Sequence, residues 1–145
     1  MTGPASVLFA CTLNSVRSPM AEAIARHYFG RRIFFDSAGV DPQPLDPMAA
    51  AVMTEIGLSL TDHRARRFNV LADTSFDLVV AFSDEAYREA RRICRTAHVA
   101  LEFWPIETPR PAEGSREARL CHLRHIRDRL LTRIRDRFGA VAIEV

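Results

Sequence analysis

The sequence predicts an α/β fold with three layers, α/β/α, around a central, mostly parallel sheet of four strands. Short apolar runs of strand length alternate along the chain with longer segments of helical periodicity. No repeat, low-complexity tract or linker interrupts the 145 residues, so residues 1–145 are expected to form one domain. The hydrophobic content of 48% and the charged content of 26% are typical of globular proteins.

The first predicted strand and helix follow one another closely. Residues 6–10 are apolar and bounded by polar residues, which is typical of a buried strand. A helix is expected to begin at Ser18 or Pro19 and to end at Gly30. Its apolar positions fall on one face: Met20, Ala21, Ile24, Ala25 and Tyr28.

The next pair of elements is marked by proline and glycine. Residues 32–39 predict a strand that ends in a glycine turn. Residues 46–57 predict a helix with Asp46 as its N-cap, Pro47 at the first position and Gly57 as its end.

The second half of the chain repeats the alternation. Residues 76–82 predict a buried strand, 83–96 a helix and 98–103 a further strand. Residues 107–114 form a proline-rich loop before a long helix over 115–138. The buried face of that helix is expected to carry Leu120, Leu123, Ile126, Leu130, Leu131, Ile134 and Phe138.

Two cysteines are each followed by an arginine six residues later, Cys11–Arg17 and Cys121–Arg127. Arginine fills 20 of the 145 positions, so this spacing alone is weak evidence. The second pair lies in a predicted helix, where six residues rotate side chains by roughly 240° and separate them by about 9 Å. The two side chains cannot converge on one ligand, and we interpret Cys121 as a packing residue.

The first pair lies where a strand meets a helix, so backbone N–H groups can point into one concavity. Asn14 tolerates the positive φ that a tight cradle needs. Arg17 adds a planar fork that matches a tetrahedral oxyanion. Ser18 can cap the helix or donate its hydroxyl to a thiolate. A helix N-terminus with an arginine also favours a nucleophilic cysteine, so we predict an anion-binding catalytic loop around Cys11. A buried cysteine beside a surface arginine is the alternative.

The stretch CTLNSVRSPMAEA, residues 11–23, resembles the phosphate-binding loop of the low-molecular-weight protein tyrosine phosphatases. Further similar stretches follow in the family's order at 36–40, 46–68, 76–84 and 104–109, so the resemblance covers most of the chain. It implies a hydrolase in which Cys11 attacks phosphorus and forms a cysteinyl-phosphate. Arg17 and backbone N–H groups would bind the phosphoryl oxygens, and Ser18 would steady the thiolate. The loop residues that would bind phosphate are Thr12, Leu13, Asn14, Ser15, Val16 and Arg17.

Three departures from the family pattern affect this expectation. Leu13 stands where the family usually has glycine, and Val16 replaces a neighbouring cysteine, which excludes a disulfide within the loop. The family's acid aspartate is replaced by Thr108, before Pro109. A threonine hydroxyl is too weak an acid to protonate a phenolate. Glu107 is therefore the candidate acid; without it the protein should be a slow phosphatase, a hydrolase for good leaving groups, or an oxyanion-binding relic.

The arsenate reductases that share this fold are the alternative. The thioredoxin-coupled type needs further cysteines, but Ser83 occupies the expected position and the nearby Cys94 is interpreted as structural. An arsenate reductase that uses a small external thiol would need only Cys11.

The remaining expectations concern partners and location. A phosphorylated protein or small aryl phosphate is the expected substrate, with inorganic phosphate or sulfate able to occupy the loop. No cofactor or metal is expected, and His122 and His125 are interpreted as ordinary helix residues. The net charge of +2 and the interspersed acids argue against nucleic acid, and no apolar run suggests a membrane segment. Three cysteines, an odd number without paired spacing, favour the reducing cytoplasm, and the arginine-rich last helix suits a monomer or weak homodimer.

Overall fold

The computed structural model describes residues 3–69, 73–96, 98–109 and 115–143. The strands in these ranges are β1 (Ser6–Cys11), β2 (Phe34–Gly39), β3 (Leu78–Ala81) and β4 (Ala100–Phe103). The helices are α1 (Arg17–Phe29), α2 (Pro47–Thr54), α4 (Asp84–Thr96) and α5 (Arg116–Ile143). Within the described ranges, no helix has the length and apolar character needed to cross a bilayer.

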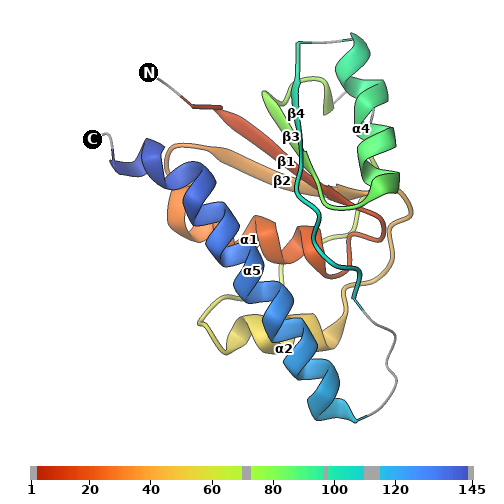
Figure 1. Cartoon of the computed structure of the whole chain (residues 1–145), viewed down its shortest axis with the longest axis vertical. Helices are drawn as coiled ribbons and strands as arrows, with labels where there is room; N and C mark the ends of the chain where they lie inside the picture. The colour runs from red at the N-terminus through yellow and green to blue at the C-terminus, as the bar shows by residue number, and fades with distance from the viewer. Residues whose placement is uncertain (1–2, 70–72, 97, 110–114, 144–145) are drawn as a thin grey trace.

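The strands form one sheet in the order β2-β1-β3-β4, and every neighbouring pair is parallel. Helix α4 lies on one side of the sheet and α1 and α5 lie on the other (Figure 1). The predicted three-layer α/β/α architecture with a parallel, four-stranded sheet is confirmed. The carboxyl end of β1 lies in the middle of the sheet, where a crevice between neighbouring connections can bind ligands.

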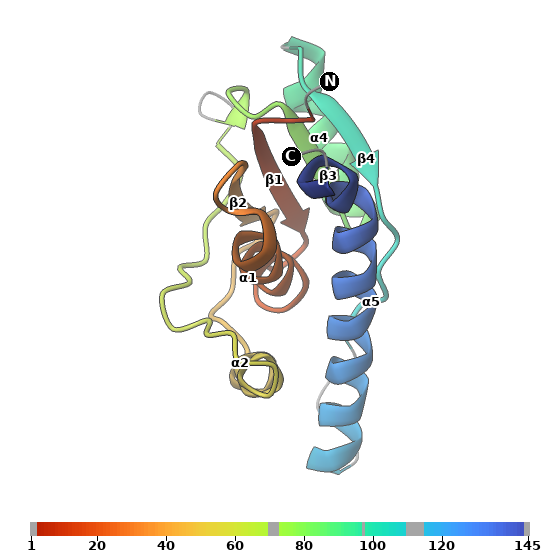
Figure 2. The same ribbon diagram turned by 90° about the vertical axis from the view of Figure 1, so that its left-hand side faces the viewer.

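Alternate residues of β1 point into two separate cores, as the two-residue period of a strand requires. Val7 and Phe9 pack with α1, α2 and α5, whereas Leu8 and Ala10 pack with α4. Helix α5 is the long rod that runs beside α1 and α2 (Figure 2). Its apolar stripe is buried as predicted, apart from the half-buried Leu131.

Some predicted boundaries are wrong by a few residues. The backbone N–H groups of Arg32 and Ile33 donate to the carbonyl of Phe29, so β2 begins only at Phe34. Helix α5 continues past Phe138 to Ile143, because one glycine lowers helix propensity by only about 1 kcal/mol and does not end a helix.

The predicted buried face of α1 is wrong at its end. Tyr28 is 45% exposed, and Phe29 is buried in its place against Phe138. The ring centroids of Phe29 and Phe138 lie 6.1 Å apart, so the last turn of α1 is fixed by its contact with α5.

Candidate active site

The loop between β1 and α1 forms a tight cradle around the Cys11 side chain. Cys11 is the last residue of β1 and is only 2% exposed. Asn14 adopts a φ of 54°, the positive value expected for this loop. Its backbone N–H points at the Cys11 Sγ atom at 3.2 Å. The chain therefore turns back over its own sulfur atom.

Ser18 contributes to the site through its side chain rather than as a helix cap. Helix α1 begins at Arg17 with Val16 as its N-cap, which makes no side-chain capping bond. The Ser18 Oγ atom lies 2.8 Å from Cys11 Sγ. Of the two roles expected for Ser18, the structure shows the contact with the sulfur.

A buried hydrogen-bond network fixes Asn14. Its Nδ2 atom donates to Ser18 Oγ at 2.7 Å and to Ser37 Oγ at 3.1 Å. Its Oδ1 atom accepts from the Arg66 backbone N–H at 3.0 Å. The Asn14 carbonyl oxygen lies 3.1 Å from His63 Nε2. Segments distant in sequence thus hold the loop in one shape, and His63 contacts the loop backbone.

Gly39, at the end of β2, lets the cradle approach the sheet closely. A Cβ atom at this position would lie 2.8 Å from Asn14 Cβ and 2.9 Å from the Asn14 backbone nitrogen. Such contacts are shorter than a packed interior tolerates without movement. The neighbouring segment is also bonded to the loop, because Val40 donates to the Cys11 carbonyl and Asp41 to the Thr12 carbonyl.

The Arg17 guanidinium is buried without a carboxylate in hydrogen-bond contact among the described residues. The residue is 4% exposed, and Nη1 donates to the carbonyls of Phe82 at 3.3 Å and Ile106 at 3.1 Å. Burial lowers the pKa of Arg17, and the charges of Cys11 and Glu85 oppose this shift. A buried cation held by neutral carbonyls alone is unusual, because most buried charges are paired.

A cavity of about 460 Å³ opens over the cradle. Its lining combines loop residues with the N-cap of α2 and with side chains from α4, α5 and the segment after β4: Cys11, Thr12, Leu13, Ser15, Val16, Arg17, Asp46, Glu85, Thr108, Pro109 and Arg119. Leu13 is 42% exposed at the mouth, where the family usually has glycine. The cavity thus brings together the predicted loop with Thr108, but not with Glu107.

The Glu107 carboxylate points toward α5. It lies 3.3 Å from Arg129 Nη1, 3.5 Å from His125 Nε2 and 3.8 Å from His122 Nδ1. To act as the acid, Glu107 would have to leave these three partners and turn toward Cys11. The adjacent Thr108 already lines the cavity.

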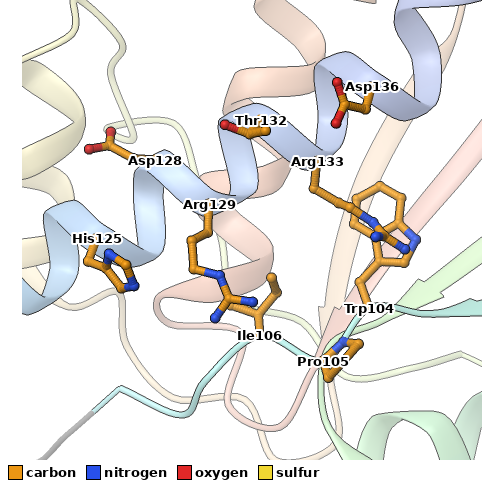
Figure 3. A pocket seen from close by; sticks show the side chains of 9 residues that line it. All are labelled: Trp104, Pro105, Ile106, His125, Asp128, Arg129, Thr132, Arg133 and Asp136. Carbon is orange, nitrogen blue, oxygen red and sulfur yellow. The ribbon is translucent and has the colours of Figure 1, made fainter.

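Two of the partners of Glu107 belong to a second cavity, of about 510 Å³, between α5 and residues 104–106 (Figure 3). His125 and Arg129 line it, and the Arg133 guanidinium lies over the Trp104 ring at 5.1 Å from its centroid. The cradle is not part of this second cavity. This second cavity matters for the site because two residues that line it, His125 and Arg129, contact the Glu107 carboxylate.

Three charged residues of the cavity over the cradle were not predicted from the sequence as part of the site: Asp46, Glu85 and Arg119. Asp46 was recognised only as an N-cap; its Oδ1 accepts from the Met48 N–H, and its other oxygen pairs with Arg119 on α5. Glu85, in the first turn of α4, was not singled out from the sequence; its Oε1 lies 3.3 Å from Thr12 Oγ1. Helix-terminal acids are common, so their residue types gave no signal that separates a cap from a cavity wall.

The other two cysteines lie away from the cavity lining. Cys121 is exposed on α5, so its interpretation as a packing residue is wrong. Cys94 is half-buried against the core on the α4 side, in agreement with a structural role. Of the two histidines on α5, His125 is exposed and His122 is largely buried. Among the described residues, no group of three or more His, Cys, Asp or Glu side chains is arranged to hold a metal ion.

The sequence model for low molecular weight phosphotyrosine protein phosphatases matches residues 6–144. The chain belongs to this family. An arsenate reductase from Shouchella clausii is 32% identical over 129 residues, which cover 89% of this chain and 91% of the relative. Membership of this family makes the protein a cysteine-dependent, phosphatase-like enzyme.

Two solved structures of this family's fold superpose over nearly the whole chain. The YwlE arginine phosphatase, in a mutant with a phosphorylated active-site serine, gives a TM-score of 0.79 at 22% identity and covers 96% of this chain and 97% of its own. A protein tyrosine phosphatase gives a TM-score of 0.73 at 26% identity, with 96% of this chain and 97% of its own covered. The resemblance noted from the sequence is confirmed.

Proposed function

We propose that this protein hydrolyses phosphomonoesters through a cysteinyl-phosphate intermediate on Cys11. The observation that carries the proposal is Arg17, a buried guanidinium bonded to two carbonyls beside the Cys11 sulfur. A bound phosphoryl group would supply the anion that this cation needs. Inorganic phosphate or sulfate should occupy the same cradle.

In the proposed first step, the Cys11 thiolate attacks phosphorus in line with the leaving oxygen. The S–P bond forms as the P–O bond breaks, and Arg17 with the N–H groups of residues 12–18 stabilises the equatorial oxygens. Ser18, 2.8 Å from the sulfur, holds the nucleophile in place. Water then attacks phosphorus, the S–P bond breaks, and phosphate and the thiolate are released.

The leaving group has no evident proton donor. Thr108 occupies the acid position and its hydroxyl does not protonate a phenolate near neutral pH. Glu107 is engaged on α5 by Arg129 and His125. We therefore expect hydrolysis to be slow for poor leaving groups and efficient for good ones.

The test is hydrolysis of 4-nitrophenyl phosphate and phenyl phosphate by the purified protein, with Cys11→Ser as the control. Thr108→Asp should raise the rate for phenyl phosphate by about 10²-fold, the lower end of general-acid effects, and change the 4-nitrophenyl rate little. Activity no greater than that of Cys11→Ser on either substrate would refute the enzyme proposal and favour an oxyanion-binding relic.

Arsenate reduction is the second candidate function, because the Shouchella clausii relative is an arsenate reductase. A thiol relay through this chain is disfavoured: Ser83 stands where a second cysteine is expected, and burial raises the pKa of the Cys94 thiol. We infer that arsenate chemistry would need an external small thiol. Arsenate turnover that depends on added glutathione and is lost in Cys11→Ser would promote this alternative over the phosphatase.

The cellular setting remains part of the proposal. All three cysteines are unpaired, which fits the reducing cytoplasm expected from the sequence. A phosphorylated protein or small aryl phosphate as substrate, and a monomer or weak homodimer as the assembly, stay predictions.

A further inference from the structure

Two backbone carbonyls orient the buried Arg17 guanidinium, and both accept from the same nitrogen atom. Nη1 donates to Phe82 at 3.3 Å and to Ile106 at 3.1 Å. The two hydrogen atoms of Nη1 are thereby used, whereas Nε and Nη2 donate to no described residue. These two nitrogens form an edge of the guanidinium that can bind an oxyanion in a bidentate manner. The direction of that edge therefore depends on where the two carbonyls lie.

The two carbonyls lie in segments that are held in different ways. Phe82 follows β3, and its backbone N–H donates to the Ala10 carbonyl of β1 at 2.9 Å. Trp104, after β4, is bonded to β3 in the same manner. Beyond Trp104 this pattern stops, because residues 105–109 make no backbone–backbone hydrogen bond with any described residue. The sheet fixes the Phe82 carbonyl, but side chains must fix the Ile106 carbonyl.

Two neighbouring side chains hold the segment that carries this carbonyl. The Ile106 side chain is buried in the core. The next residue, Glu107, extends its carboxylate to α5, where it contacts Arg129, His125 and His122. Arg129 in turn extends from α5 toward Ile106 (Figure 3). Because α5 packs along α1 and α2, Glu107 connects the segment to a fixed part of the molecule.

Arg129 is the partner that carries a permanent charge. Its Nη1 atom lies 3.3 Å from Glu107 Oε1, closer than either histidine nitrogen. His122 and His125 add a charge to the contact only when they are protonated. The ion pair between Glu107 and Arg129 is therefore the part of the cluster that a substitution can remove at any pH.

We propose that Glu107 is a positioning residue for Arg17 and not the proton donor. Its contacts with α5 hold the Ile106 carbonyl against Arg17 Nη1, which keeps the Nε–Nη2 edge directed at the phosphoryl oxygens. This inference rests on the proposed function, because Arg17 acts there on the transferred phosphoryl group.

Glu107→Gln distinguishes positioning from acid catalysis. Glutamine keeps the size of the side chain but loses the ion pair, so kcat/KM should fall about two- to fivefold, the effect that a part-exposed ion pair can supply. The fall should be equal for 4-nitrophenyl phosphate and phenyl phosphate, because a displaced Arg17 slows both reactions. Loss of a general acid would instead slow only phenyl phosphate, by about 10²-fold or more. That second pattern would overturn the proposal.

A double variant tests whether the effect passes through α5. Arg129→Gln should reproduce the loss, and Glu107→Gln combined with Arg129→Gln should lose no more than either alone, since both remove one contact. Additive losses would overturn the link to α5. Glu117→Gln is the matched control, because it removes a carboxylate that pairs with Arg124 on the same helix. It should leave kcat/KM unchanged, and a loss equal to that of Glu107→Gln would contradict the proposal.

Binding of inorganic phosphate measures the orientation of Arg17 without turnover. Titration calorimetry should show a Kd about two- to fivefold higher for Glu107→Gln than for the wild type, and an unchanged Kd for Glu117→Gln. A Kd for Glu107→Gln equal to that of the wild type would overturn the positioning role.

The outcomes separate this inference from the proposed function. If the wild type does not hydrolyse 4-nitrophenyl phosphate above the Cys11→Ser background, the proposed function fails, and weaker phosphate binding by Glu107→Gln would still support the positioning role. If the wild type is active and Glu107→Gln equals it in both rate and Kd, only the positioning role fails.

Discussion

The chain contains the same cysteine–arginine spacing twice, and the two copies have opposite environments. At Cys11–Arg17 the sulfur is buried and the guanidinium is bonded to two backbone carbonyls. At Cys121–Arg127 the cysteine is exposed, and the arginine is bonded to the carboxylates of Glu55 and Asp128 and to the carbonyl of Val52. Both arginines are buried, at 4% and 8% exposure.

The difference lies in what neutralises the arginine. Arg127 is satisfied by carboxylates of its own chain, so it has no need of a ligand and serves to join α5 to α2. Arg17 is held in place by neutral groups and keeps its charge available. A cation that the fold buries but leaves without a fixed anion is a better indicator of an anion site than any spacing.

Substitution of each cysteine by serine should give the largest difference in activity between the two regions. Cys11→Ser is expected to lower kcat for 4-nitrophenyl phosphate on the order of 10⁴-fold or more, since it removes the nucleophile. Cys121→Ser, on the exposed face of α5, should retain full activity. Steady-state kinetics measure both. A Cys121→Ser enzyme as impaired as Cys11→Ser would show that the two regions do not differ in function.

Exchange of the arginines should separate activity from stability. Arg17→Lys keeps the charge but loses the bidentate fork, so kcat should fall about 10²–10³-fold. Arg127→Lys should leave kcat intact and lower the free energy of unfolding by about 1–3 kcal/mol, because it disrupts a buried hydrogen bond to Val52 and a half-buried one to Glu55. Urea unfolding and initial rates for both variants provide the test, and the reverse pattern would contradict the assignment.

A methyl group at Gly39 should displace the loop around Cys11, because Gly39 packs directly against Asn14. Gly39→Ala places a Cβ atom 2.8 Å from Asn14 Cβ, so the loop must move. We expect a loss of about 1–3 kcal/mol in the free energy of unfolding and about 10²-fold in kcat, the effect of a displaced catalytic geometry. Gly139→Ala is the control, since its Cβ would meet no atom within 4 Å. Unchanged kcat in a folded Gly39→Ala protein would contradict the proposed support.

Low pH should reduce the stability that the region around Arg127 contributes, and this effect should be the smallest of those predicted. Hydrogen bonds from Arg124, followed by those from Arg127, lower the pKa of Glu55 from 4.5 to about 2. Because the folded pKa lies below the unfolded one, the contribution is complete above about pH 4.5 and is lost as the pH falls toward 2. The urea midpoint of the wild type should therefore fall more between pH 6 and pH 3 than that of Glu55→Gln. Identical falls would show that Glu55 adds no pH-dependent stability.

The order of strands and helices and the strand–loop–helix setting of the cradle were predictable because their determinants are local, whereas contacts from distant residues such as Ser37 and Arg66 hold the loop in its final shape. The strand β1, the positive φ of Asn14 and the helix that follows it arise from neighbouring residues. The capping role of Asp46 was also readable from its position before Pro47. The residue that is buried at the end of α1 could not be predicted, because Tyr28 and Phe29 are both aromatic and only the contact with Phe138 decides which is buried.

The sequence by itself determined the parallel α/β architecture and a loop in which Cys11, Arg17 and Ser18 converge, since periodicity and a strand–loop–helix junction are short-range properties. Only the tertiary structure decided what faces that loop. The pairing of Asp46 with Arg119 spans 73 positions, and the approach of Thr12 to Glu85 also spans 73. The packing of α5 likewise decides that Glu107 is held by Arg129 and His125 while Thr108 lines the cavity. Such contacts arise when distant elements pack on the same sheet, and residue order alone does not encode them.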